Sequence, residues 1–378
     1  MSCPLKINSM KFNRVHVGIS RLLFFFVIAL AIGCSHNRNV ETVDYHRFLK
    51  EQDCSFGDTP DEYVDAMLYN AVFYDSGQYI FVYKGHFLVF DFADSVCRFF
   101  DKGNAVHNII ASPDTGSVWY IEYRNRLCEA KSGFRSTFRG TIPFYDSNFT
   151  AVPYRQLPFV DGRIYTSVFT SLKKELIPVD QYQHWPHAAI WHIEGDTVLF
   201  DTVFGTFPEN YPYDNEGTAH LSHLLFNPDD SIIVFYSDMM STVSLYSLNG
   251  KFISEKYLGS SHFISPEKLT IEDYLDQDKC IEWKKSNTLY QTIVYDPYRD
   301  VYLRPMRLPS RQDPDALELS SDNWIMVVAD RNFNVKYEVL FDNDSYRVAS
   351  RVLPTPQGVY VEKKLTDTEI AIDKFVFE

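Results

Sequence analysis

One stretch of the sequence decides the predicted fold, and it reads Phe226-Asn227-Pro228-Asp229-Asp230-Ser231-Ile232-Ile233-Val234-Phe235. A Pro/Asp turn is followed at once by a run of β-branched and aromatic residues, which is typical of a turn that leads into a β-strand. An apolar segment also precedes the turn. The stretch therefore predicts a β-hairpin.

The same arrangement of apolar strand, Pro/Asp/Gly turn and aromatic-rich strand recurs along the chain in six degenerate copies. The turns of these copies lie at residues 74–77, 112–116, 160–162, 227–230, 296–300 and 354–358. Successive turns are separated by roughly 40 to 70 residues, and repeats of about 40 to 50 residues with four strands each are typical of β-propeller blades. The longer spacings leave room for loop insertions.

Composition supports the same architecture, because aromatic residues make up 16% of the chain and helical periodicity is nearly absent. Short strand-like runs are predicted at 78–83, 87–92, 118–123, 164–169, 189–192, 197–203, 232–236, 243–247, 301–303, 324–329, 336–341 and 359–363. We therefore predict an all-β fold, a β-propeller of six blades, with seven blades as the alternative.

One segment differs in pattern from its surroundings. Residues 265–276 begin with Ser265-Pro266 and then carry apolar residues at helical spacing. This pattern predicts a short helix inserted between the fourth and fifth blades.

The N-terminus predicts export. Four basic residues flank or precede an apolar run at 22–30: Lys6, Lys11, Arg14 and Arg21. The run is short for a membrane-spanning helix and polar residues follow it, so residues 1–33 are predicted to be a signal peptide. The segment Leu30-Ala31-Ile32-Gly33-Cys34 resembles the bacterial lipobox, which implies that Cys34 is the lipid-bearing residue. The alternative is a chance cysteine at the end of an ordinary secretory signal.

Lipidation divides the chain into three predicted parts: the signal peptide, a lipidated tether and lead-in at 34–66, and a single propeller domain at 67–378. Acyl chains on Cys34 would make the lipid bilayer the first partner of the protein. Residue 35 is Ser, whereas Asp at this position signals inner-membrane retention in enterobacterial lipoproteins. No acidic run follows, so we expect an outer-membrane lipoprotein that faces the periplasm.

The charge of the chain argues against nucleic acid as a partner. The formal net charge is −14, and removal of the signal peptide takes away basic residues and no acidic ones. An acidic protein without a Lys/Arg cluster repels polyanions. A small cationic or neutral ligand remains compatible with this surface.

Four cysteines lie beyond the lipobox: Cys54, Cys97, Cys128 and Cys280. They allow three pairings, between which the sequence does not choose, and structural thiols are the alternative. None belongs to a CxxC pair, so a zinc ribbon is not predicted. We expect no cofactor and no metal.

Three resemblances refine the predicted fold. The stretch 226–235 resembles the hairpin of TolB-like propeller repeats. Residues 112–119 resemble the Asp box of sialidase propellers, departing from it at Val118. The plan of signal, lipid cysteine and divergent blades resembles six-bladed β-propeller lipoproteins of Bacteroidetes.

The aromatic segment 180–213 is the candidate ligand face. Its candidate contact residues are His184, Trp185, His187, Trp191, Tyr211 and Tyr213. Aromatic faces stack on sugar rings or cations. The alternative is that these rings pack between blades. Pro186 makes a helix unlikely to align His184 with His187, so we do not predict a metal site there.

The sequence shows no catalytic signature such as GxSxG, a P-loop, GxGxxG or HExxH. We therefore expect a non-enzymatic binding or scaffolding propeller whose ligand is an envelope protein or a glycan. The alternative is a sialidase-like or other glycan-processing enzyme, for which Arg304, Arg307 and Arg311 are the candidate carboxylate-binding arginines. That alternative is weakened because sialidases draw their arginines from different blades.

Overall fold

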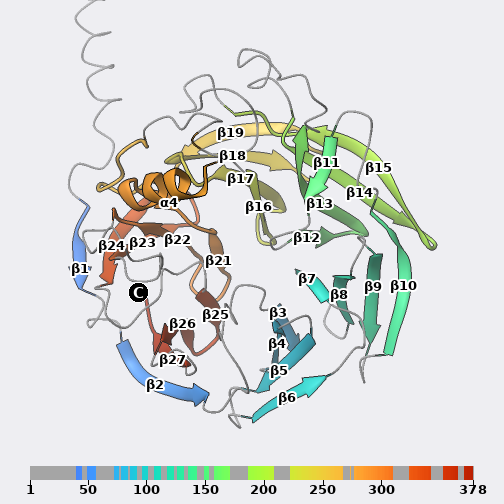
Figure 1. Cartoon of the computed structure of the whole chain (residues 1–378), viewed down its shortest axis with the longest axis horizontal. Helices are drawn as coiled ribbons and strands as arrows, with labels where there is room; N and C mark the ends of the chain where they lie inside the picture. Colours follow the sequence, from blue (N-terminus) through green and yellow to red (C-terminus); the bar gives the residue numbers. More distant parts are fainter. Residues whose placement is uncertain are drawn as a thin grey trace, which may run out of the picture. The chain divides into compact units, whose positions relative to one another are not determined.

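In a computed structural model, the part of the chain that can be described forms β-strands and one short helix, α4 at Gln277–Ser286 (Figure 1). The structure describes residues 40–44, 49–56, 72–75, 78–83, 86–91, 96–100, 106–111, 117–122, 126–131, 135–142, 149–152, 157–170, 186–207, 222–266, 273, 276–309, 323–341, 352–364 and 370–377. All of the elements belong to one compact unit, Glu41–Glu378. The predicted signal peptide and Cys34 lie outside the described residues.

The strands form five hydrogen-bonded sheets of a β-propeller. Two sheets have four strands in plain chain order. One contains β3 (Val72–Asp75), β4 (Gln78–Tyr83), β5 (His86–Asp91) and β6 (Val96–Phe100), and the other contains β16 (Ser222–Asn227), β17 (Ile232–Ser237), β18 (Thr242–Ser247) and β19 (Phe252–Tyr257). Neighbouring strands in both are antiparallel.

A third sheet has nine strands. They are β7 (Val106–Ala111), β8 (Ser117–Glu122), β9 (Arg126–Lys131), β10 (Arg135–Thr141), β11 (Phe149–Val152), β12 (Leu157–Val160), β13 (Arg163–Thr170), β14 (Ala188–Glu194) and β15 (Thr197–Phe204). Six blades were predicted and five sheets are found. The difference arises here, because a parallel pairing of β7 with β12 joins two antiparallel groups of strands.

The other two sheets recruit strands from the N-terminal region. One contains β20 (Leu289–Tyr290), β21 (Val294–Asp296), β22 (Val301–Arg307), β23 (Trp324–Asp330), β24 (Val335–Phe341) and β1 (Thr42–Asp44). The other contains β25 (Val352–Thr355), β26 (Gly358–Lys364), β27 (Ile370–Phe375) and β2 (Leu49–Phe56). Residues predicted to be a lead-in at 34–66 thus supply β1 and β2, which cover the edges of β24 and β27.

All twelve strands predicted from the sequence are found, eleven of them within two residues at each end, while β22 extends four residues beyond its predicted end. They are β4, β5, β8, β13, β14, β15, β17, β18, β22, β23, β24 and β26. Each combines β-branched or aromatic residues with turn residues at its ends, which is the local pattern on which the predictions were based.

The predicted helix at 265–276 falls largely outside the described residues, and Asp273, which is described, is helical. The described helix is α4 (Gln277–Ser286), and most of 267–275 lies outside the described residues. Asp276 is the N-cap, because its side chain accepts hydrogen bonds from the main-chain N–H groups of Asp278 and Lys279. The capping carboxylate therefore sets the start of α4.

The repeated turns share one mechanism in three successive repeats. Asn227, Asp296 and Thr355 each end the strand before the turn, and each accepts main-chain N–H groups two and three residues later at 2.9–3.3 Å. In two of these turns a residue with positive φ follows, namely Ser231 (52°) and Asp300 (54°). Side-chain capping of the turn explains why Asn, Asp and Thr recur there. The Asp-box-like turn at 112–116 lies outside the described residues.

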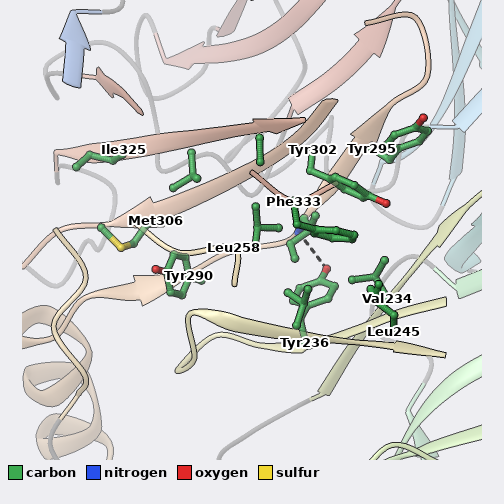
Figure 2. Close-up of a cluster of buried hydrophobic side chains, with 14 residues drawn as sticks. Val234, Tyr236, Leu245, Leu258, Tyr290, Tyr295, Tyr302, Met306, Ile325 and Phe333 are labelled. Carbon is green, nitrogen blue, oxygen red and sulfur yellow. Dashed lines mark hydrogen bonds between the residues drawn. The ribbon is translucent and has the colours of Figure 1, made fainter. Parts of the chain in front are cut away.

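The sheet β16–β19 has a packed core on both faces, because successive side chains of a strand point to opposite sides. Val234 and Tyr236 pack against the β20–β24 sheet. Ile233 and Phe235 pack toward β13–β15. Figure 2 shows the first of these clusters, in which the Tyr236 hydroxyl accepts a hydrogen bond from the main-chain N–H of Ile293 at 3.1 Å.

Candidate functional site

The candidate site is an open cavity of about 440 Å³ between the end of β15 and the outer strands β18 and β19. Its volume falls within the usual range for small-molecule sites. The described residues that line it are four aromatic residues, three smaller side chains, two glycines and one charged residue: Phe204, Phe207, Tyr246, Phe252, Val203, Thr206, Ser244, Gly205, Gly250 and Glu255.

A β-bulge places two of these side chains on the cavity face. Tyr246 pairs with Phe252 and Ser244 pairs with Glu255, with a register shift between the two pairs. Directly paired residues share a face of the sheet, whereas residues three apart on a regular strand point to opposite faces. The extra residue in β19 therefore lets Phe252 and Glu255 line the same cavity. Bulges re-aim side chains in this way beside functional sites.

The aromatic wall of the cavity is continuous. The ring centroids of Phe204 and Tyr246 are 5.1 Å apart, and those of Tyr246 and Phe252 are 5.7 Å apart, in edge-on arrangements that favour aromatic pairs. Tyr246 is buried, whereas Phe252 is 54% exposed and forms the outer rim. Burial raises the pKa of the Tyr246 hydroxyl, and the nearby Glu255 carboxylate raises it further. The phenol is therefore neutral at physiological pH.

The inner wall is held by a predicted site residue, His187. Its main-chain N–H donates to the Gly205 carbonyl at 2.7 Å, and its ring lies 4.3 Å from the ring of Phe207. Gly205 has φ of +75°, and a Cβ atom there would lie 2.7 Å from the Phe235 ring. Glycine thus lets the chain leave β15 in close contact with Phe235 and turn along the cavity.

The other predicted ligand-face residues are only partly described. Trp191 is buried in an apolar cluster, and its indole N–H donates to Thr166 Oγ1 at 2.8 Å. Neither Trp191 nor the buried His187 side chain lines the cavity. His184, Trp185, Tyr211 and Tyr213 lie outside the described residues, so their role stays a prediction. Within the predicted segment 180–213, residues 203–207 supply half of the cavity lining.

Arg304, a candidate for the sialidase-like alternative, is fully buried. Its guanidinium donates to three main-chain carbonyls, those of Leu258 at 2.6 Å, Ser237 at 2.9 Å and Met240 at 2.7 Å. It also lies 3.8 Å from the ring centroid of Tyr290, a cation–π contact. These contacts join the β16–β19 region to β22, so Arg304 has a structural role. Arg311 lies outside the described residues.

Arg307 is also buried and donates to the Asn287 carbonyl at 3.4 Å. Among the described residues, no group of three His, Cys, Asp or Glu side chains is close enough to hold a metal ion. Cys128 and Cys280 are both buried thiols, while Cys54 lies in β2 and Cys97 in β6. No helix within the described ranges is long and apolar enough to cross a bilayer.

Sequence reasoning missed Tyr246, Phe252 and Glu255 as site residues. The strand 243–247 was predicted correctly, but nothing local marks the bulge in β19 that turns Glu255 toward the cavity. The sequence offered one signal for these residues, which is an aromatic residue at 252 directly after the turn residues Gly250-Lys251. A ring next to a hairpin turn is common enough that it indicates no site by itself.

Comparison with known proteins identifies the fold. No family model matches the sequence, and neither does any curated protein. The structure is similar to that of a member of the DUF4221 family from Bacteroides vulgatus, with a TM-score of 0.61 and 16% identity over 87% of this chain and 94% of that one. This similarity shows the propeller fold. The similar protein comes from a Bacteroides species, which agrees with the resemblance to Bacteroidetes proteins.

Two more distant structures are also similar. One is a structural genomics protein of unknown function from Bacteroides thetaiotaomicron, with a TM-score of 0.44 and 9% identity over 89% of this chain and 75% of that one. The other is the calcium-binding protein regucalcin from Agrobacterium tumefaciens, with a TM-score of 0.44 and 9% identity over 83% of this chain and 93% of that one. At this level of similarity neither informs function.

Proposed function

We propose that this protein is a lipid-anchored binding protein of the bacterial envelope, which holds a ligand at the cavity between β15 and β19 without transforming it. The observation that carries the proposal is the cavity lining. Aromatic rings and hydroxyl groups surround an open space of about 440 Å³ and would give a ligand both apolar contact and hydrogen bonds.

The same lining favours binding over glycoside hydrolysis. Most glycosidases use a pair of carboxyl groups, one on each side of the scissile bond. Among the described residues that line the cavity, Glu255 is the one carboxylate. The buried arginine Arg304 uses its donors on main-chain carbonyls, so it does not serve the carboxylate recognition on which the sialidase-like alternative depends.

The number of blades and the lipid anchor are also part of this proposal. We take the nine-stranded sheet to be two blades, β7–β10 and β12–β15, because only two residue pairs join β7 to β12. This grouping makes a six-bladed propeller.

The acylated Cys34 would tether the propeller to the outer membrane on its periplasmic side, leaving the cavity free to receive an envelope glycan or a small solute.

Cavity binding is tested by ligand-detected NMR with a fragment library. Thr206 is exposed and lines the cavity, so Thr206→Trp places a large side chain in that space. Thr197→Trp, at the exposed first residue of β15 and outside the cavity, is the matched control. We expect a set of fragments to bind the wild type and the control but not Thr206→Trp. If no fragment depends on the cavity, the proposal is wrong.

Anchoring is tested separately by fractionation of cells that produce the full chain. We expect the wild type in the outer-membrane fraction and Cys34→Ala in the soluble periplasmic fraction. Equal membrane association of the two proteins would contradict the lipid anchor.

A further inference from the structure

The charge of the cavity narrows the class of ligand. Glu255 is exposed and is the single charged residue among the ten described residues that line the space. Its neighbour Lys256 pairs with Val243, whereas Glu255 pairs with Ser244, so the two side chains leave opposite faces of β19. Lys256 therefore points away from the cavity, and Glu255 gives the described lining a net negative charge.

Aromatic rings reinforce this potential. The faces of aromatic rings carry partial negative charge and attract organic cations within about 6 Å of the ring centroid. Phe204, Phe207, Tyr246 and Phe252 all contribute to the lining. Their combination with one carboxylate is the chemistry that recognises an ammonium group, because the rings contact its apolar surface and the carboxylate balances its charge.

Other ligand classes fit less well. An anion would meet the unbalanced Glu255 carboxylate. A hard metal cation needs about six oxygen ligands, and the lining offers one carboxylate with the hydroxyls of Thr206, Ser244 and Tyr246. A neutral sugar would stack on the rings and donate hydroxyl groups to Glu255, but it would not balance the charge of that carboxylate. The formal net charge of −14 for the whole chain also favours the approach of cations.

We propose that the cavity between β15 and β19 binds an organic ammonium group through its aromatic wall and Glu255. This inference rests on the proposed binding function and specifies its ligand. The ammonium could be carried by a small free molecule or by a lysine side chain, and the chemistry of recognition is the same in both cases.

The test compares choline with 3,3-dimethylbutan-1-ol, its neutral isostere, by titration calorimetry on the folded protein at low ionic strength. We expect choline to bind at least about fivefold more tightly than the isostere, since a cation–π contact with a partner carboxylate adds to apolar contact. Glu255→Gln should lower choline affinity to that of the isostere and leave the isostere unchanged. The control Glu194→Gln removes an exposed carboxylate outside the cavity and should change neither.

Two further probes identify the source of the ammonium group. Nα-acetyl-lysine amide and its norleucine counterpart differ only in the terminal amine. Preferential binding of the lysine derivative, lost in Glu255→Gln, would assign a peptide-borne ammonium, whereas binding of choline alone would assign a small free cation.

Equal binding of choline and its isostere, or an unchanged choline affinity in Glu255→Gln, would overturn the inference. The fragment screen with Thr206→Trp would still report whether the cavity binds other ligands, so failure of the ammonium inference is distinguishable from failure of the proposed function.

Discussion

The two faces of the β16–β19 sheet meet their neighbours in different ways. On one face Val234, Tyr236 and Leu245 pack against the β20–β24 sheet, and the fully buried Arg304 closes the interface by donating to three carbonyls. On the other face Phe235 and Tyr246 pack toward β13–β15, but an open cavity remains beside them.

Side-chain size at the contact explains the difference. Large rings and a guanidinium fill the first interface, including Tyr290 stacked under Arg304. At the second interface the small Ser244 side chain fills little of the space, while Gly205 and Gly250 bring the main chain close to Phe235 and Phe204. The interface with the β20–β24 sheet therefore contributes stability, whereas the interface with β13–β15 leaves room for a ligand. Four variants test this division.

The largest effect is expected from Arg304→Met, which breaks the filled interface. Three buried carbonyls would lose their donor, so the free energy of unfolding should fall by about 3 to 5 kcal/mol. Urea denaturation of the purified domain measures this loss. Lys251→Met, at an exposed basic residue of the β18–β19 turn, is the control and should change the midpoint little. Similar midpoints for both variants would show that Arg304 does not hold the interface.

The next effect is expected from Gly205→Ala, compared with Gly162→Ala. Both glycines have positive φ, +75° and +71°, but a Cβ atom at 205 meets the Phe235 ring at 2.7 Å while at 162 nothing lies within 4 Å. Backbone strain alone should cost about 1 kcal/mol at 162, and overpacking should raise the total to about 2 to 4 kcal/mol at 205. Chemical denaturation compares the two. Equal losses of unfolding free energy in the two variants would show that the Phe235 ring moves to accommodate the added methyl group at little cost.

A smaller, pH-dependent effect is expected from Tyr165→Phe. The Tyr165 hydroxyl donates to the Leu248 carbonyl at 2.9 Å across the cavity-bearing interface, so its removal should cost about 1 kcal/mol near neutral pH. Burial raises the pKa of Tyr165 from 10.0 to about 12. The unfolded chain therefore ionises this phenol first as the pH rises above 10, and the wild type loses stability between pH 10 and 12.

Phenylalanine cannot ionise, so the difference between the wild type and Tyr165→Phe should narrow across that same pH window. Urea unfolding at neutral pH and at about pH 11 checks this expectation. A difference that stays constant with pH would show that the phenol ionises equally in the folded and unfolded chains.

The smallest effect on stability is expected from Phe252→Ser at the cavity rim. This ring is 54% exposed, so the free energy of unfolding should change by no more than about 0.5 kcal/mol. Ligand binding in the cavity should nevertheless weaken, because one of its four aromatic rings is lost. Calorimetric titration and denaturation on the same sample separate the two readouts. A large loss of stability with unchanged binding would place Phe252 in the core instead.

Local patterns predicted much of this fold. The strands at 232–236 and 324–329 and the turns at 227–230 and 296–300 follow from β-branched residues beside Pro, Asp and Asn, which act within a few residues of themselves. The helix α4 at 277–286 was not predicted, although its N-cap carboxylate Asp276 is a local signal. The recruitment of β1 and β2 depended on distant partners and was not predicted.

The sequence by itself determined an all-β chain of repeated hairpins, because strand and turn preferences are local. Only the tertiary structure decided that Glu255 and Phe252 share a face, since that depends on the register of β18 with β19. It also decided that residues 203–207 close the cavity opposite them. Register and packing between segments far apart in the chain are set by how whole sheets fit together, and no short stretch of sequence encodes that fit.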